Sequence, residues 1–245
     1  MITLLLADAE LERVPASITG HPQVASSARR VGASASRMLL DSSLHHAGMR
    51  KLPEAARRGR PDLIHFFLLT ALESPVNRAG HLRLLVHTRE DYLIRIEPRT
   101  RLVRNYNRFC GLIQQLYEAG RVPAENALLT LEPSRTLVDI VGEIEPDRTI
   151  ILDETGDVRA PWELFGTGDT QGETLCIVGG FPSGTFRSTL PEGEHVSFGS
   201  DLLTVWTVAS ELLGNYERFL PWPPTRVVGG PEPDPAPPQR EPPQR

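Results

Sequence analysis

A chain of 245 residues, 40% of them hydrophobic, is long enough to bury one large core or two small ones. No apolar run approaches the length of a membrane span, and the first residues lack the basic region of a signal peptide, which argues against an embedded or secreted protein. Cys110 and Cys176 lie far apart in apolar surroundings. We therefore expect free thiols in a reducing cytoplasm.

The net charge of −5 hides an asymmetry between the two halves of the chain. Residues 1–122 hold 18 Lys and Arg against 11 Asp and Glu, which gives +7, and residues 123–245 hold 8 against 20, which gives −12. Lys51 is the only lysine, so the basic character of the first half comes from arginine. Arginine presents a planar fork to phosphates and a flat face that stacks on bases, which favours RNA as a ligand. GC-rich genomes and thermophily also enrich arginine, so composition alone leaves both interpretations open.

The first third of the chain contains two apolar runs and a pair of histidines. Residues 2–7 predict a strand, and residues 38–41 predict a short buried strand that ends in a polar turn. Asp41 is placed to cap a following helix that carries His45 and His46. Adjacent histidines point apart on any regular element, and no third ligand lies at metal-binding spacing. We therefore predict no metal site.

Three arginines flank a glycine turn at residues 57–60. Pro61 restricts Arg60 to an extended conformation. Asp62 lies two residues from Arg60 and can hold its guanidinium by a charge-assisted hydrogen bond. An arginine held in this way can offer its remaining donors to a phosphate. The alternative is an ordinary solvated turn.

The region after this turn alternates between apolar runs and polar turns. Residues 63–69 predict a deeply buried helix or strand, and residues 82–87 and 92–96 predict two strands. A helix is expected next, with one apolar face formed by Phe109, Leu112, Ile113 and Leu116.

Arg101, Arg104 and Arg108 are spaced i, i+3 and i+7, so they would line one face if this helix began early enough. If residues 101–103 are loop, the three side chains can still converge on one ligand. No acidic residue occurs in residues 100–117, which favours polyanion binding over a solvated helix face.

The acidic second half begins with short apolar runs that are bounded by Pro, Gly and acidic residues. Residues 128–131, 137–142 and 149–152 predict strands, and residues 153–157 predict an acidic turn. These strands and those before them indicate an α/β protein.

A glycine-rich stretch near residue 180 is the strongest candidate for a ligand site. Residues 175–178 predict a buried parallel strand, which Gly179 and Gly180 follow at once. Residues 196–200 predict a loop before a long apolar helix that Asp201 could cap. A strand that ends in a glycine loop exposes backbone groups at the edge of the sheet where α/β proteins bind ligands. The same pattern also occurs in plain turns.

The last part of the chain is rich in proline. Ten of the 22 prolines lie in the last 25 residues, and Pro-Pro-Gln-Arg occurs twice, at 237–240 and 242–245. We expect residues 221–245 to form an extended, disordered tail.

Five motifs occur in order along the basic part of the chain: Asp-Ser-Ser-Leu-His-His at 41–46, Arg-Gly-Arg-Pro-Asp at 58–62, Glu-Ser-Pro-Val-Asn at 73–77, His-Thr at 87–88 and Arg-Leu-Val-Arg-Asn-Tyr-Asn-Arg-Phe at 101–109. Their order and spacing resemble the Nep/Emg family of pseudouridine-specific ribosomal RNA methyltransferases, which belong to the SPOUT class. The resemblance covers roughly residues 1–220, and the short form is similar to archaeal members.

The resemblance implies a SPOUT-type α/β fold, a parallel sheet with helices on both faces. Its C-terminal part would be tied in a deep trefoil knot, an exception to the rule that chains do not thread loops. Residues 1–220 would form a single methyltransferase domain. Its basic RNA-binding elements would lie at about 41–116 and its knotted cofactor-binding part at about 126–220.

The resemblance also implies an activity. The methyl donor would be S-adenosylmethionine, and the acceptor would be N1 of a pseudouridine in a hairpin of small-subunit, 16S-type ribosomal RNA during ribosome biogenesis. The protein would be a cytoplasmic homodimer without a metal or a membrane partner. An alternative is an RNA-binding ribosome-assembly factor whose methyl transfer is secondary. The arginines serve both hypotheses, whereas the glycine loops at 179–184 and 198–200 serve only the methyltransferase.

Carried over residue by residue, the resemblance assigns roles to individual side chains. Arg60, Arg101, Arg104 and Arg108 would contact RNA, and Asp62 would orient Arg60. Asp62 is also a candidate general base, although a carboxylate paired with arginine makes a weak one, and the catalytic residue is otherwise unknown. Cofactor contacts would come from Leu152, Gly179, Gly184, Phe198, Gly199, Ser200, Asp201, Leu202 and Leu203.

Overall fold

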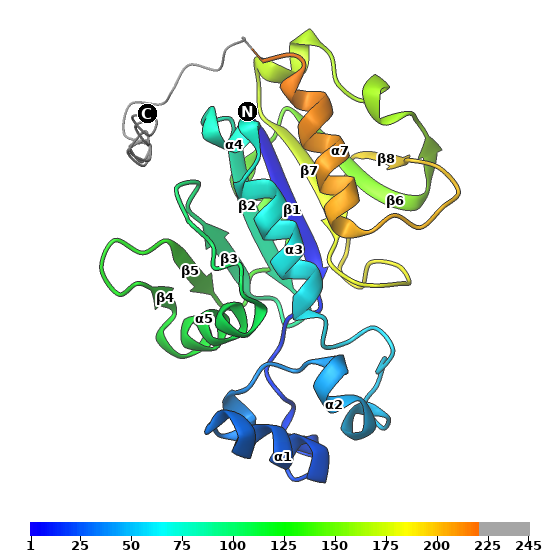
Figure 1. Ribbon diagram of the computed structural model, residues 1–245. Helices are drawn as coiled ribbons and strands as arrows, with labels where there is room; N and C mark the ends of the chain where they lie inside the picture. Colours follow the sequence, from blue (N-terminus) through cyan, green and yellow to red (C-terminus); the bar gives the residue numbers. More distant parts are fainter. Residues whose placement is uncertain (221–245) are drawn as a thin grey trace, which may run out of the picture.

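One eight-stranded sheet runs through the protein, with helices on both of its faces (Figure 1). This computed structural model describes residues 1–220, so the predicted proline-rich tail at 221–245 lies outside the described residues. The strands lie in the order β4-β5-β3-β2-β1-β7-β6-β8. Their bounds are β1 (Ile2–Ala9), β2 (Leu82–Thr88), β3 (Leu93–Ile96), β4 (Arg121–Val122), β5 (Leu129–Glu132), β6 (Arg148–Val158), β7 (Thr174–Gly179) and β8 (Glu194–Ser197).

The sheet is mixed, whereas the family resemblance implied a parallel sheet. Strands β2, β1, β7, β6 and β8 pair in parallel, whereas β3, β5 and β4 form an antiparallel extension at one side. Residues 89–92 join β2 to β3, and a connection of this length can join only antiparallel neighbours. The carboxyl ends of the five parallel strands all lie at one edge of the sheet. The candidate site forms at this edge.

Seven helices are described, and three of them cover one face of the sheet. Helices α3, α5 and α7 pack on that face and α6 packs on the other. Figure 1 shows α1 and α2 as a separate layer beyond the carboxyl end of β1. The helix bounds are α1 (Pro22–Val31), α2 (Ser42–Met49), α3 (Pro61–Leu72), α4 (Pro75–Arg78), α5 (Tyr106–Ala119), α6 (Leu137–Ile144) and α7 (Val205–Glu217).

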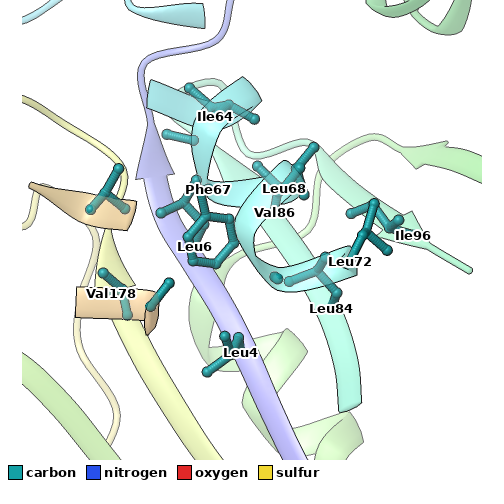
Figure 2. Close-up of a cluster of buried hydrophobic side chains, with 14 of the residues drawn as sticks. Leu4, Leu6, Ile64, Phe67, Leu68, Leu72, Leu84, Val86, Ile96 and Val178 are labelled. Atoms are coloured by element: carbon teal, nitrogen blue, oxygen red, sulfur yellow. The ribbon is translucent and has the colours of Figure 1, made fainter. Parts of the chain in front are cut away.

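The central strand β1 is buried along its whole length because both of its faces are covered. Leu4 and Leu6 face α3, and Figure 2 shows Leu6 beside Phe67 of α3. Leu5, between them, faces the α6 side. Burying one such side chain contributes roughly 1.5–3 kcal/mol, so α3 is held firmly over the strand that precedes the site.

Residues 137–142 form the helix α6 and not the predicted strand. Leu137, Ile140 and Ile144 recur at helical spacing and pack on the sheet. A capping box begins the helix: Thr136 and Asp139 each accept the other's backbone N–H at 3.2 Å. A short apolar run is ambiguous between strand and helix, and here the cap decides for helix.

Two further expectations were wrong in detail. Residues 153–157 do not form a turn, because β6 continues to Val158 after a register shift and pairs Asp157 with Val196 of β8. Residues 38–41 form no strand, and only an isolated bridge links Leu39 to Arg13. The predicted strands at 2–7, 82–87, 92–96, 128–131, 149–152 and 175–178 are confirmed.

Three properties of the described residues bear on function. Cys110 and Cys176 are free thiols, as expected. Residues 1–220 contain no group of three or more His, Cys, Asp or Glu side chains placed to hold a metal ion. No helix within the same range is both long and apolar enough to cross a bilayer.

Candidate active site

The predicted cofactor residues come together at the carboxyl edge of the parallel strands. Leu152 of β6 lies between Val178 of β7 and Val196 of β8, because all three are register partners. The segments that follow β7 and β8 therefore start at the same edge of the sheet, on either side of β6. Gly179 is the last residue of β7, Gly184 lies in the segment after it, and residues 198–203 follow β8.

The backbone geometry of these two segments explains why glycine occurs in them. A Cβ on Gly180 would lie 2.6 Å from the Cα of Ala9, so only glycine allows the loop to pass β1 this closely. Gly184 and Gly199 have φ angles of 90° and 132°, which residues with side chains rarely adopt. Among the described residues, no atom lies within 4 Å of the place where a Cβ of Gly199 would stand. The backbone there is open to a ligand.

The segment before α7 is longer than predicted. Helix α7 begins at Val205, with Thr204 as its N-cap residue, so Asp201 does not cap it. Leu202 and Leu203 are 71% and 39% exposed, and extending the helix back over them would bury no apolar surface. Ser197 closes the start of the loop by donating a hydrogen bond from its hydroxyl to the carbonyl of Gly199 at 2.9 Å. Residues 198–203 therefore remain a loop at the sheet edge.

Arg60 and Asp62 form the ion pair that the sequence predicts. Nε and Nη2 of Arg60 donate to the two carboxylate oxygens of Asp62 at 2.9 and 2.7 Å. This hydrogen bonding raises the pKa of the Arg60 guanidinium above its ordinary value, so it stays charged. Pro61 occupies the first turn of α3, where its missing N–H costs nothing. The fork of Arg60 is thus fixed at the beginning of the helix.

The other two arginines of this turn point into the protein. Arg57 is paired with Glu10 at 2.6 Å and Arg58 with Glu12 at 2.6 Å. Both glutamates are essentially fully buried. Of the three arginines in this turn, two neutralise buried carboxylates, and Arg60 alone is available to a phosphate.

A cavity of about 820 Å³ opens beside Arg60. Arg60, Asp62 and Arg104 line it together, although Arg104 lies more than 40 positions further along the chain. Phe66 of α3 also lines it and packs against Trp206 of α7 with ring centroids 5.1 Å apart. The first turn of α7 directly follows the loop at 198–203, so the cavity wall and that loop are neighbours.

Arg101 and Arg108 do not line the cavity. Helix α5 begins only at Tyr106, with Asn105 as its cap, so Arg101 and Arg104 lie in the preceding loop and Arg108 in the first turn. The three arginines therefore form no continuous helix face. Arg101 and Arg108 are exposed, and within residues 1–220 neither forms an ion pair.

The structure also places Asp41 and Tyr106 in the cavity wall, which the sequence did not indicate. Asp41 caps α2, as predicted, by accepting the N–H of Ser43 at 2.8 Å, but it also lines the cavity. Its second oxygen accepts the hydroxyl of Tyr106 at 2.6 Å. Burial and this hydrogen bond raise the pKa of Tyr106, so it remains a neutral donor. Burial also raises the pKa of Cys110 to about 11, which keeps that thiol protonated.

The fold and these motifs agree with known proteins. The model of the EMG1/NEP1 methyltransferase family matches residues 4–217. The chain belongs to this family. The Nep1 protein of Thermococcus onnurineus, called a ribosomal RNA small subunit methyltransferase, is 42% identical over 220 residues, which are 90% of this chain and 100% of that one. The protein of the same name from Methanothrix thermoacetophila is 45% identical over 222 residues, 90% of this chain and 97% of that one.

A solved EMG1/NEP1 structure is also similar. The crystal structure of Archaeoglobus fulgidus Nep1 bound to S-adenosylhomocysteine has a TM-score of 0.78 and 34% sequence identity, and the match covers 89% of this chain and 97% of that one. The EMG1/NEP1 match at residues 4–217 contains the whole cavity lining and all three predicted cofactor segments. The individual roles of these residues stay predictions.

Proposed function

We propose that the protein transfers a methyl group from S-adenosylmethionine to N1 of a pseudouridine in a hairpin of small-subunit ribosomal RNA. Its family membership supports methyl transfer, and the names of its relatives support small-subunit ribosomal RNA as the substrate. The Archaeoglobus relative was crystallised with S-adenosylhomocysteine, which is the compound left when S-adenosylmethionine has given up its methyl group. The acceptor atom is the most specific part of the proposal.

The segments at the sheet edge suit a methyl donor that is recognised through backbone groups. We assign its binding to Leu152, to Gly179 and Gly184, and to residues 198–203. Gly180 allows the loop to pass close to β1, and Gly184 and Gly199 adopt backbone conformations that residues with side chains rarely take. When bound, the cofactor supplies a methyl group already activated on a sulfonium, so the protein has mainly to align donor and acceptor and to exclude water.

The cavity beside Arg60 is the observation that best supports RNA binding in this proposal. Arg60, Asp62 and Arg104 arrive in it from two distant segments, and its Phe66 wall touches the helix that follows the cofactor loop. Guanidinium groups at this place can hold the phosphates on either side of an extruded nucleotide. Arg101 and Arg108 extend the basic surface beyond the cavity, and we assign them to the flanking RNA backbone.

The reaction needs a proton to leave the acceptor. The methyl group passes from sulfur to N1 while the N1–H proton departs, leaving a methylated base and a neutral thioether. Asp62 is the one candidate base from the sequence, yet both of its oxygens accept from Arg60. This geometry favours a role in orienting Arg60 and leaves the proton acceptor unassigned.

Four wider features of the proposal follow from the family resemblance. We infer a homodimer. We also infer a cytoplasmic location. The trefoil knot and the division into basic and cofactor-binding parts of one domain stay predictions.

Methyl transfer to two matched RNA hairpins tests the proposal. The hairpins differ only in carrying uridine or pseudouridine at one loop position, and labelled S-adenosylmethionine supplies the methyl group. We expect label in the pseudouridine hairpin alone, because uridine has carbon where pseudouridine has the N1–H group. Equal labelling of both would refute the acceptor assignment. Hairpin binding without S-adenosylmethionine binding in calorimetry would instead support the assembly-factor alternative.

A further inference from the structure

Glu10 lies between the cofactor loop and the arginine turn and contacts both. Its backbone N–H donates to the carbonyl of Gly180 at 3.0 Å, and its own carbonyl accepts the N–H of Arg60 at 3.0 Å. The side chain is fully buried at the end of β1. One residue therefore joins the segment proposed to bind the cofactor to the residue proposed to bind RNA.

Arg57 connects the same two segments through its side chain. Nε donates to Glu10 at 2.6 Å, and Nη1 donates to the carbonyl of Thr185 at 2.8 Å. The guanidinium also lies over the ring of Phe181, 4.1 Å from its centroid. Only 8% of Arg57 is exposed, so it is held within the protein and does not reach out to a ligand. Two of its three contacts are with the loop that carries Gly179 and Gly184.

We infer that Arg57 is a positioning residue that couples cofactor binding to RNA binding, an inference that depends on the proposed function. A cofactor held at Gly179 and Gly184 orders the loop and so orders Phe181 and Thr185. Arg57, fixed against them, then holds the backbone turn that aims Arg60. The second ligand meets a turn that is already ordered, so each ligand raises the affinity for the other by the same factor.

This role requires the planar shape of arginine. A guanidinium can donate from separate nitrogens to Glu10 and to Thr185 while its face lies on Phe181. A lysine ammonium at the same place can keep the ion pair but presents no flat face and no second, separated donor. Glu10 also pairs with Arg89, so it keeps a positive partner when Arg57 is replaced. Arg57→Lys should therefore fold while losing the link to the loop.

Arg58 provides a matched control in the same turn. It too is a nearly buried arginine paired with a buried glutamate, through two hydrogen bonds to Glu12 at 2.8 and 2.6 Å. Its remaining contact is with the carbonyl of Pro53, not with the loop after β7. Arg58→Lys therefore alters a comparable ion pair without touching the proposed link.

The test measures the affinity of a small-subunit ribosomal RNA hairpin by fluorescence anisotropy, with and without saturating S-adenosylhomocysteine. In the wild type and in Arg58→Lys, we expect the cofactor product to raise hairpin affinity about tenfold, a typical coupling between sites. In Arg57→Lys the gain should fall below about twofold, with hairpin affinity in the absence of the product little changed. A general loss of stability would weaken both measurements and would leave their ratio intact.

A second variant approaches the same link from the other side. Phe181→Leu removes the ring beneath the guanidinium and should reduce the coupling as Arg57→Lys does. Undiminished coupling in both variants, or no coupling in the wild type, overturns the inference and leaves the proposed methyl transfer standing. A wild type that binds neither hairpin nor S-adenosylhomocysteine overturns the proposed function as well.

Discussion

Arginines of one short basic region are used in two opposite ways. Arg57 and Arg58 have side chains about 10% and 12% exposed and neutralise buried glutamates, whereas Arg60 and Arg104 are 28% and 83% exposed and line the cavity. Arg57, Arg58 and Arg60 represent both kinds within four consecutive positions of the chain. Charge counted along a sequence therefore states how many cations exist, but not how many a ligand can reach.

The physical consequence is a division between stability and binding. Removing one partner of a buried ion pair leaves a charge without solvent or counter-ion, which is strongly destabilising. An exposed arginine contributes little to folding but is free to neutralise a phosphate. Substitutions in the two groups should thus produce separate phenotypes, and the predictions below run from the largest effect to the smallest.

Arg58→Ala should give the largest loss of stability. Among residues 1–220 it leaves the buried Glu12 with only the more distant Arg89, at 3.7 Å, so we expect about 3 kcal/mol less free energy of unfolding. Urea denaturation followed by circular dichroism measures this change. A loss below about 0.5 kcal/mol, the range of ordinary surface substitutions, would show that the pair is not a buried one.

Arg60→Ala and Arg108→Ala should weaken hairpin binding with little effect on stability. Each removes a charge-assisted contact of about 1.5 kcal/mol, or roughly tenfold in affinity, and each should flatten the dependence of affinity on salt. Affinity for S-adenosylhomocysteine should not change. Arg37→Ala, which removes an exposed arginine paired with Glu118 outside the cavity, is the control. An unchanged salt dependence in both test variants would contradict the RNA assignment.

The neighbouring histidines repeat the comparison on a smaller scale. His45 is fully buried, and burial lowers its pKa, whereas His46 is exposed. Below about pH 6.5, His45 binds a proton in the unfolded chain but not in the folded protein. The stability contributed by neutral, buried His45 is therefore present above that pH and is lost as the pH falls below it. The free energy of unfolding should fall less in His45→Gln than in the wild type as the pH drops from about 7.5 to 5.5. A fall in His45→Gln as large as that in the wild type, or larger, would contradict this assignment.

Much of the fold could be predicted because its strands are buried on both faces. Unbroken apolar runs such as residues 2–7 and 175–178 can hardly be anything but interior strands. The run at 137–142 was misjudged because a segment of this length satisfies strand and helix equally well. The cap formed by Thr136 and Asp139 was the signal that could have decided it.

The candidate site could be predicted only where its contacts are local. Asp62 holds Arg60 because the two side chains lie two positions apart at one helix end. The meeting of Asp41 with Tyr106, separated by 65 positions, had no local signal. The inward direction of Arg57 and Arg58 likewise had no local signal, since their partners Glu10 and Glu12 lie just beyond β1, 47 and 46 positions earlier in the chain.

The sequence by itself determined the family, the buried strands, the glycine segments and the Arg60–Asp62 pair. These features depend on residue types and on spacings of a few positions, because hydrophobic burial and backbone geometry act directly on such local patterns. Only the tertiary structure decided which arginines face a ligand and that Glu10 lies between two loops. The reason is that crossovers of a parallel sheet bring together segments more than 100 positions apart. The ion-pair partners of a charged side chain therefore depend on which distant segments lie next to it in the fold, and not on the residues beside it in the chain.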